Sequence, residues 1–471
     1  MALRFFNTLT QELEVFHPQK DNTVRMYTCG PTVYNFVHIG NFRTFTFQDI
    51  LRRWLRYRGY KLDHVMNITD VDDKIIANAA KEQKSIDDYT RNYTKAFFED
   101  AAALRLEQPE HVAPATKHIP EMVDAIQKLA DKGYTYTNDG STYFRIANFS
   151  QYGKLSHNDF AGIRSGARVD VDEYDKADAR DFVLWKARKG NERSWSTPFG
   201  DGRPGWHIEC SAMAMSYLGE TLDIHAGGVD LIFPHHENEI AQSESITGKP
   251  FARFWLHSEH LHIESQKMSK SLGNFYTLRD LLEAGYQPEA IRYLLASVPY
   301  RKKLNFTFEG LKAAAKSIER LRDFEARVAS AKLPPGRNEA VSDRSAAAIR
   351  QFEEALDDDL NTAEALAAVF EYVRAINSAL DEQQFQEENR WDAARVLEVF
   401  DGLFDVLKPG ASADTAATAL PSNGEIDSYI EQRQQAKKKR DFARADEIRT
   451  LLDSKGILLE DTKEGVRWKR K

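Results

Sequence analysis

The sequence contains almost no cysteine and no long apolar run. Only 2 of the 471 residues are cysteine, Cys29 and Cys210, so a framework of disulfides is excluded and each thiol needs its own explanation. No apolar stretch approaches the ~20 residues that cross a bilayer, and we therefore expect no membrane-spanning segment. Polar residues at Asn7, Thr8 and Gln11 interrupt the N-terminus too early for the apolar segment of a signal peptide, and we therefore expect a cytoplasmic protein.

Positive charge is scarce over most of the chain. Lys and Arg number 64 against 72 Asp and Glu, a formal net charge of -8, which argues against a protein coated with basic surface for nucleic acid. Residues 431–471 differ, with 13 Lys and Arg against 8 Asp and Glu. The composition therefore predicts that contacts with nucleic-acid phosphates come from this basic tail. The alternative for the tail is a charged, solvated helix.

The N-terminal pattern is typical of an α/β domain. An apolar segment at 24–29 runs into Gly30, and a second short apolar segment follows at 62–68. Between them, apolar residues recur at the spacing of one helix face, at Phe47, Ile50, Leu51, Trp54 and Leu55. Strand, helix and strand in this order form the βαβ unit of a parallel sheet covered by helices. We predict a Rossmann-like α/β domain.

Changes of pattern divide the rest of the chain. Polar and charged residues dominate from about 107 to 195, which predicts an insertion into a catalytic domain spanning 1–308. The pattern then turns helical, with one apolar face formed by Leu311, Ala315, Ile318 and Leu321 and an N-cap at Asn361. We expect a bundle of roughly four helices at 309–407, a linker at 408–425 and a small α+β module at 426–471.

A candidate phosphate-binding segment lies between the first predicted strand and the first predicted helix. It reads His38-Ile39-Gly40-Asn41. Gly40 permits a ligand to approach the backbone, His38 offers a donor to a phosphate oxygen, and Asn41 is suited to cap the helix and to donate to the ligand. Helix N-termini favour phosphate groups. The alternative is an ordinary capped helix with a surface histidine.

A second candidate phosphate-binding segment is the run Lys267-Met268-Ser269-Lys270-Ser271. Lysine supplies a mobile point charge to the oxygens that gain negative charge during phosphoryl or nucleotidyl transfer. Two lysines three residues apart, in a loop with serine and glycine, are therefore suited to close on a polyphosphate. The alternative is a solvated basic turn, which the fully specified pentapeptide disfavours.

These two motifs resemble the signatures of class I aminoacyl-tRNA synthetases, and their surroundings resemble the cysteinyl-tRNA synthetase family. The resemblance extends over nearly the whole chain and rests on the segments 27–34, 67–74, 205–210, 233–239, 445–449 and 459–462. It implies ATP with Mg²⁺, L-cysteine and tRNA(Cys) as substrates. One residue departs from the pattern, because the first signature usually ends in a second histidine. Asn41 stands there instead, and its amide donates a hydrogen bond but carries no charge.

A candidate metal site includes His235 and Glu239. These residues are four apart, which on a helix places both side chains on one face within reach of one ion. Alone, such a run is usually solvated, and a buried cysteine usually packs as a small apolar side chain. The resemblance implies that Cys29 and Cys210 join them around one zinc ion per chain. A zinc protease motif is disfavoured, because Ile240 stands where that motif needs its second histidine.

The resemblance also implies how cysteine is selected and activated. A soft thiolate bonds zinc better than a hydroxyl does, so zinc separates cysteine from serine. Thr69, Trp206 and His225 are expected to line the amino-acid pocket, the alternative for them being packing at the sheet edge. Cysteinyl adenylate then forms from ATP and passes to tRNA, whose anticodon the tail module reads. The residues expected at the nucleotide are His38, Gly40, Asn41, Lys267 and Lys270.

Three rival functions stay open at this point. An ATP-dependent ligase that joins cysteine to an amino sugar would use the same catalytic domain without the basic tail. A zinc hydrolase is disfavoured by Ile240. A non-catalytic RNA-binding protein on a synthetase scaffold is disfavoured by the intact lysine motif at 267–271.

Overall fold

The computed structural model divides into two compact units, Met1–Leu407 and Lys408–Lys471. The structure describes residues 2–158, 181–190, 192–268 and 273–408 in the main part of the chain. In the tail it describes 429–430, 432–434, 436–437, 442–454, 457–462 and 465–470. Each unit is treated separately below. No helix among these residues is long and apolar enough to cross a membrane.

A five-stranded parallel sheet lies at the centre of the first unit. Its strand order is β12-β11-β3-β4-β5, and every pair of neighbours is parallel. The strands are β3 (Thr23–Thr28), β4 (Lys61–Ile68), β5 (His111–Pro114), β11 (Leu222–Gly228) and β12 (Ala252–Ser258). Strand β3, helix α1 (Ile39–Tyr57) and strand β4 form the predicted βαβ unit. The Rossmann-like prediction is confirmed.

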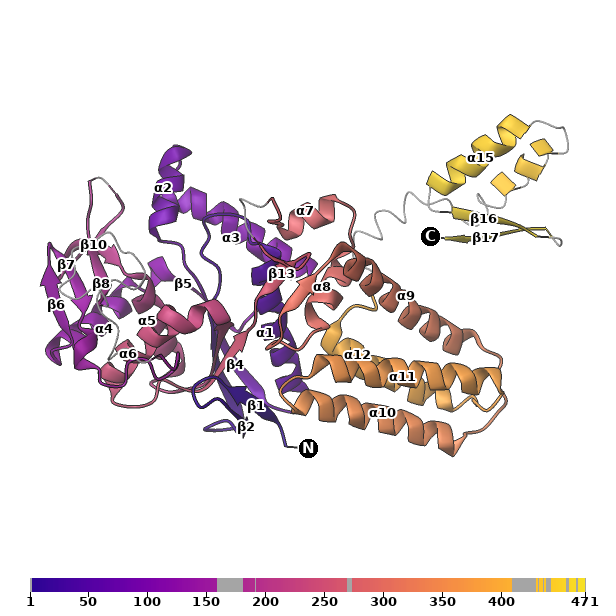
Figure 1. Ribbon diagram of the computed structural model, residues 1–471, viewed down its shortest axis with the longest axis horizontal. Helices are drawn as coiled ribbons and strands as arrows, with labels where there is room; N and C mark the ends of the chain where they lie inside the picture. Colours follow the sequence, from indigo (N-terminus) through magenta and orange to yellow (C-terminus); the bar gives the residue numbers. More distant parts are fainter. Residues whose placement is uncertain are drawn as a thin grey trace. The chain divides into compact units, whose positions relative to one another are not determined.

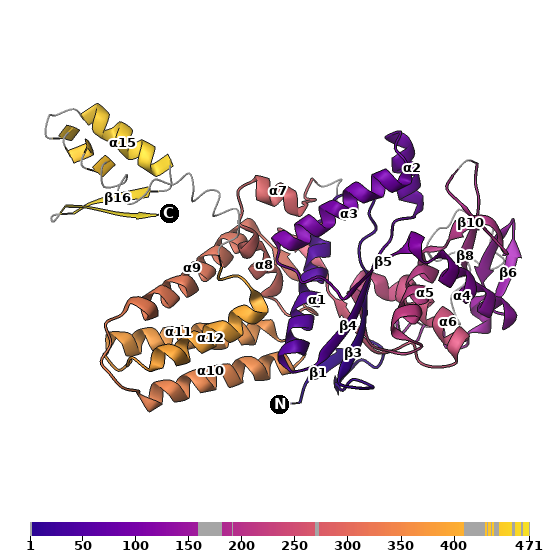
Figure 2. The same ribbon diagram turned by 180° about the vertical axis from the view of Figure 1, so that it is seen from behind.

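Helix α1 covers one face of this sheet, and helix α5 (Trp206–Leu218) covers the other (Figures 1 and 2). The predicted apolar face of α1 is buried throughout. Its N-cap, however, is His38 and not Asn41: the ring nitrogen Nδ1 accepts a hydrogen bond from the Asn41 backbone N–H at 3.2 Å. Because the imidazole already satisfies this orphan donor, the Asn41 side chain is not used as the cap.

Further helices and strands complete the sheet domain. Helix α5 packs with α4 and α6 in a second apolar core on its side of the sheet. An N-terminal antiparallel hairpin, β1 with β2, contacts the edge strand β12. The elements are β1 (Arg4–Asn7), β2 (Glu12–Val15), α2 (Asp73–Lys81), α3 (Ile86–Ala103), α4 (Ile119–Asp131) and α6 (Glu237–Thr247).

A second sheet lies within and just after the predicted insertion. It has the order β6-β7-β8-β10-β9, and its neighbours are antiparallel. The strands are β6 (Thr135–Asn138), β7 (Ser141–Phe144), β8 (Phe182–Ala187), β9 (Trp195–Thr197) and β10 (Gly200–Pro204). The sequence analysis assigned no strands to the predicted insertion at about 107–195, and that was wrong. These strands are three to six residues long and alternate with charged loops, so their apolar periodicity is weak.

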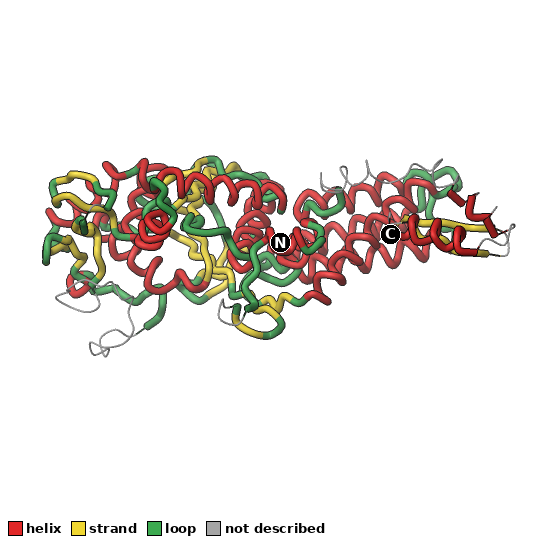
Figure 3. Tube along the Cα trace, turned by 90° about the horizontal axis from the view of Figure 1, so that it is seen from above, coloured by secondary structure: helices red, strands yellow, loops and turns green. Residues whose placement is uncertain are grey.

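Beyond the sheet domain the described chain becomes helical (Figure 3). A small sheet, β13 (Leu261–Ile263), β14 (Gln266–Lys267) and β15 (Leu304–Phe306), precedes the long helices. The helices are α7 (Leu278–Glu283), α8 (Pro288–Ala296), α9 (Phe308–Ser330), α10 (Glu339–Asp357), α11 (Thr362–Asp381) and α12 (Asn389–Phe404). The last four form the predicted bundle (Figure 1). On α9 the buried face includes Ala314, and the expected Ala315 is exposed.

The second unit contains a helix and a hairpin. Helix α15 (Phe442–Ser454) is followed by β16 (Ile457–Thr462) and β17 (Gly465–Arg470), which pair antiparallel. Ala445, Ile448, Leu452 and Ile457 are buried in its small core. The predicted linker at 408–425 lies, apart from its first residue, outside the described residues.

Candidate functional site

Four potential metal ligands meet where the central sheet ends. Cys29 follows strand β3, Cys210 lies on helix α5, and Glu239 lies in the first turn of α6. His235 belongs to the π-helical turn η5 (Ile232–His236) that leads into α6. All four side chains are buried, and their ligand atoms lie within 4.8 Å of one another. The structure therefore brings Cys29 and Cys210 together, although they are 181 positions apart in the sequence.

A carboxylate joins the imidazoles in this group. Glu239 Oε1 lies 2.8 Å from His235 Nε2 and 4.0 Å from Cys29 Sγ. Its second oxygen, Oε2, lies 2.7 Å from His225 Nε2. A second set of possible ligands overlaps the first, because Cys29, His225, His236 and Glu239 also have ligand atoms within 4.8 Å. Both sets share Cys29 and Glu239.

The proton affinities of these groups diverge strongly. Burial raises the pKa of Cys29 well above its usual value, whereas a hydrogen bond from Cys29 lowers the pKa of Cys210 to about 6. Burial opposes the charge of Glu239, but His225 and His235 outweigh it and lower its pKa to about 2. Burial likewise opposes the charge of His235, and Glu239 and Cys210 raise its pKa to about 10. Thiolate and carboxylate forms are what a metal ion requires of such ligands.

Two further histidines extend the site toward the N-terminal hairpin. His236 Nε2 lies 3.3 Å from Cys29 Sγ, and His236 Nδ1 lies 2.8 Å from His257 Nε2. His257 Nδ1 in turn lies 2.7 Å from Thr8 Oγ1. The sequence analysis did not identify His257 or assign a role to His236. The His235-His236 pair was visible, but nothing in the spacing joins residue 257 or residue 8 to it.

Two of the three predicted pocket residues contact the ligand group, and the third, Thr69, contacts a neighbouring carboxylate. The indole of Trp206 stacks on the ring of His235, with centroids 4.2 Å apart and planes at 29°. His225 lies on strand β11 and bonds Glu239, as described above. Thr69 follows strand β4 and donates to Glu209 Oε2 at 3.0 Å. Glu209 is buried next to Cys210, and burial raises its pKa well above its usual value. Sequence reasoning missed Glu209, because one carboxylate on a helix carries no signal.

The two predicted phosphate-binding motifs also lie side by side. The backbone N–H of Ile39 donates to the carbonyl of Tyr276 at 3.0 Å, and His38 forms an isolated bridge with Thr277. A Cβ added at Gly40 would lie 3.0 Å from Met268 Cε and from the ring of His38, so Gly40 lies close to the second motif and a larger residue would require these side chains to shift. Exposed Lys267 lies on β14. Lys270 lies outside the described residues.

Comparisons with known proteins agree with this geometry. The family described as the class I (C) tRNA synthetase catalytic domain matches residues 15–316, and the DALR domain family matches residues 351–408. A cysteine-tRNA ligase of Solibacter usitatus is 64% identical over 471 residues and covers 100% of both chains. A cysteine-tRNA ligase of Koribacter versatilis is 53% identical over 498 residues, again with 100% of both chains covered.

A solved structure adds support for the fold. Methionyl-tRNA synthetase of Mycobacterium tuberculosis, in complex with methionyl-adenylate, superposes with a TM-score of 0.60 at 16% identity. The match covers 82% of this chain and 90% of that one. At this identity the likeness shows a shared architecture. The family matches and the full-length relatives go further: the chain belongs to the cysteine-tRNA ligase family of class I tRNA synthetases.

Proposed function

We propose that this protein is an ATP-dependent ligase that joins L-cysteine to tRNA(Cys). The cysteine carboxylate attacks the α-phosphate of ATP, which gives cysteinyl adenylate and pyrophosphate, and the cysteinyl group then passes to the terminal ribose of the tRNA. The observation that carries the proposal is the buried thiol, imidazole and carboxylate group, which belongs to the same unit as the two candidate phosphate-binding motifs. The full-length likeness to cysteine-tRNA ligases supports it.

We assign the metal site to Cys29, Cys210, His235 and Glu239 and the metal to zinc. Two sulfur ligands with one nitrogen and one oxygen suit tetrahedral zinc, and the second possible set contains only one sulfur. When bound there, zinc supplies a soft centre that a substrate thiolate ligates and a hydroxyl does not. A reducing compartment keeps both thiols available, and we place the protein in the cytoplasm.

The chain's own residues position the reactants. Trp206, Thr69 and His225 line the space next to the ligand group and orient the cysteine. His38 and the backbone at Gly40 receive the ATP phosphates at the N-terminus of α1, where the helix dipole favours negative charge. Asn41 donates its amide there. Lys267 and Lys270 neutralise charge on the phosphates, so catalysis comes from position and electrostatics and no protein nucleophile is needed.

The first experiment is ATP-pyrophosphate exchange with cysteine, with serine as the control amino acid and zinc content measured on the same sample. Exchange with cysteine alone supports the proposed specificity. Charging of tRNA(Cys) by the same sample then separates the tRNA ligase from a ligase acting on an amino sugar. A folded, zinc-loaded sample without exchange would contradict the proposal and favour an RNA-binding protein that has lost the chemistry.

A second experiment decides between the two possible ligand sets. Cys210→Ser should reduce bound zinc from about one ion per chain to a small fraction of that. His236→Asn removes a ligand of the second set only, and it should leave zinc bound with affinity lowered ~10–100-fold, as for loss of an outer partner. Ser216→Ala on the same helix as Cys210 is the control. Full zinc content in Cys210→Ser would overturn the assignment.

Lys270→Ala tests the lysine motif. We expect cysteine-dependent exchange to fall by two orders of magnitude or more, because removal of a group that stabilises transition-state charge costs roughly 10²–10³-fold. Zinc content should not change. Near-normal exchange in this variant would refute the role.

A further inference from the structure

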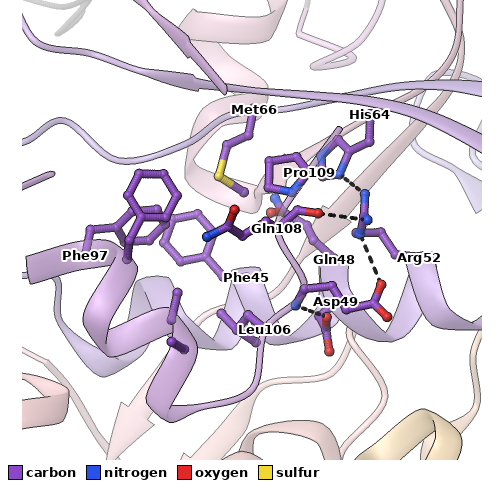
Figure 4. A pocket seen from close by; sticks show the side chains of 14 residues that line it. Phe45, Gln48, Asp49, Arg52, His64, Met66, Phe97, Leu106, Gln108 and Pro109 are labelled. Atoms are coloured by element: carbon purple, nitrogen blue, oxygen red, sulfur yellow. Dashed lines mark hydrogen bonds and ion pairs between the residues drawn. The ribbon is translucent and has the colours of Figure 1, made fainter. Parts of the chain in front are cut away.

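A cavity unrelated to the ligand group lies between helix α1, helix α3 and strand β4. Its volume is about 60 Å³. Phe45 and Phe97 lie toward one end and His64 and Arg52 toward the other, with Pro109 between them (Figure 4). The remaining lining residues are Gln48, Asp49, Met66, Phe98, Ala101, Ala102, Leu106, Glu107 and Gln108.

One polar side chain in this cavity has no hydrogen-bond partner among the described residues. Gln48 lies on α1 and is 1% exposed, yet both its Nε2 and its Oε1 are buried without a partner. Buried amides almost always have a partner, because an unpaired buried polar group is costly. A carboxamide presents an acceptor beside a donor. Gln48 therefore has an unused pair of complementary hydrogen bonds, which a rotation of its side chain toward the cavity would offer to an occupant.

The charged residues of the lining already have oppositely charged partners, and Glu107 pairs with Arg56 at 2.6 Å. Arg52 donates to both oxygens of Glu110, at 2.8 and 3.1 Å, and to the Gln108 carbonyl at 3.0 Å. Asp49 accepts from Arg292 at 2.5 Å and from Arg53 at 2.9 Å. No charge is left for an ionic occupant to balance, so a charged molecule would lose its hydration without compensation. The occupant must be neutral.

The size and walls of the cavity restrict the occupant further. A single water molecule needs a cavity volume of roughly 10–15 Å³, and an engineered cavity of roughly 150 Å³ admits a whole benzene ring. A cavity of about 60 Å³ therefore admits the edge of one ring. Exposed Ala102 and Gln108 mark its open side, where the rest of the molecule would lie. The rings of Phe45 and Phe97 suit a flat group.

We propose that this cavity is a binding site for a small, neutral, flat molecule that presents an amide or lactam edge to Gln48. The edge forms two hydrogen bonds with the carboxamide, as glutamine does with the edge of adenine. The site adjoins two elements that carry the functional site: the N-cap of α1 is His38, and His64 on β4 bonds Thr28, immediately before Cys29, at 2.7 Å. The inference does not depend on the reaction proposed above.

The test uses 2-pyridone, a one-ring lactam, titrated into the full-length protein and followed by saturation-transfer NMR. Saturating ATP and L-cysteine are present throughout, so that the nucleotide and amino-acid sites are not available to the probe. We expect saturable binding, and at least tenfold weaker binding of N-methyl-2-pyridone, which has lost the donor. The absence of saturable binding would overturn the proposal.

Two variants and a control test whether 2-pyridone binds in this cavity. Gln48→Met keeps the side chain's length and removes the amide, and it should weaken 2-pyridone binding at least tenfold. Ala101→Leu fills the cavity from α3 and should abolish binding, which keeps the test valid if the first variant folds poorly. Gln127→Met, an exposed site on α4, is the matched control and should bind as the unmodified protein does. Unchanged binding in both Gln48→Met and Ala101→Leu would also overturn the proposal.

Discussion

At the scale of single residues, His64 shows how burial decides a protonation state. It lies between Arg52 Nη1, 2.8 Å from its Nδ1, and Thr28 Oγ1, 2.7 Å from its Nε2. Arginine has only donors, so Nδ1 must accept and Nε2 must carry the single proton. Burial, together with the charge of Arg52, holds the pKa of His64 well below its usual value. The ring is therefore neutral in the folded protein.

We expect His64→Gln to reduce the pH dependence of stability. Below the pKa of an unfolded histidine, ~6.5, the unfolded chain gains a proton that folded His64 does not, so stability falls as the pH falls. The variant should lose up to about 1.4 kcal/mol per pH unit of this slope between pH 6.5 and pH 5. Urea unfolding at several pH values measures it. The two profiles should be parallel above pH 7.5, and parallel profiles below pH 6 would refute the expectation.

At the level of single residues, the candidate ligands could be predicted from the sequence, but the residues that contact them could not. Cys29 and Cys210 were singled out because they are the only cysteines, and His235 with Glu239 because of helical spacing. No sequence pattern identifies His257 and Glu209, since their hydrogen-bond partners come from other strands and helices. Their roles depend on contacts that only the folded chain brings together.

At the scale of elements, a buried arginine joins four parts of the chain. Arg292 on α8 donates to Asp49 on α1 at 2.5 Å and to the carbonyls of Phe404, at 2.5 Å, and Leu104, at 3.0 Å. It is 0% exposed. Helices α1, α8 and α12 and the end of α3 therefore meet at one guanidinium, whose planar set of donors suits several acceptors at once.

Arg292→Met should be strongly destabilising. It leaves buried Asp49 with Arg53 as its only remaining cation among the partners described, and loss of one partner of a buried ion pair costs about 3–5 kcal/mol. Arg395→Met is the matched control, because the exposed pair Arg395–Glu398 is worth at most about 1 kcal/mol. Guanidinium unfolding followed by tryptophan fluorescence gives both values. Equal losses in the two variants would contradict this account.

The N-terminus of α11 allows the contribution of a single helix cap to stability to be measured. The Asn361 side chain accepts from the Glu364 backbone N–H at 3.3 Å, which is the predicted N-cap. We expect Asn361→Ala to cost about 1 kcal/mol of unfolding free energy, the usual value for a lost cap. Ser378→Ala, within the same helix, should cost less. The same denaturant titration measures both variants, and a loss no larger than that of Ser378→Ala would contradict the capping role.

Helices and strands with a clear repeat of apolar residues could be predicted from the sequence, and short strands could not. Helix α1, strand β4 and the bundle follow from apolar residues repeated over several turns or along a buried strand. The antiparallel sheet β6 to β10 was missed, because each strand is short and its burial comes from helices and strands distant in sequence. The same reason explains the missed hairpin β1–β2.

At the scale of the whole molecule, the chain consists of two units with separate cores. The first contains the parallel sheet, both predicted phosphate-binding motifs and the bundle, and the second contains α15 and its hairpin. The adenylate-forming residues that we propose all belong to the first unit. The basic residues of 431–471 belong to the second.

Deletion of residues 426–471 should therefore separate the two steps. We expect ATP-pyrophosphate exchange within about twofold of the full chain, because that step requires only the first unit. Charging of tRNA(Cys) should fall at least 100-fold in kcat/KM, because loss of several phosphate contacts weakens nucleic-acid binding by orders of magnitude. Both assays are run on one preparation, so exchange is the internal control. Unimpaired charging would refute the role of the tail in binding tRNA.

The row of side chains from Cys29 through His236 and His257 to Thr8 has one more consequence. Burial lowers the pKa of both imidazoles, so each ring is neutral and carries one N–H. The three hydrogen bonds must then all point the same way along the row. If the sulfur accepts, as a thiolate must, both rings donate toward it and the Thr8 hydroxyl donates to His257. A thiolate at Cys29 thereby fixes the orientation of a hydroxyl at the N-terminal hairpin.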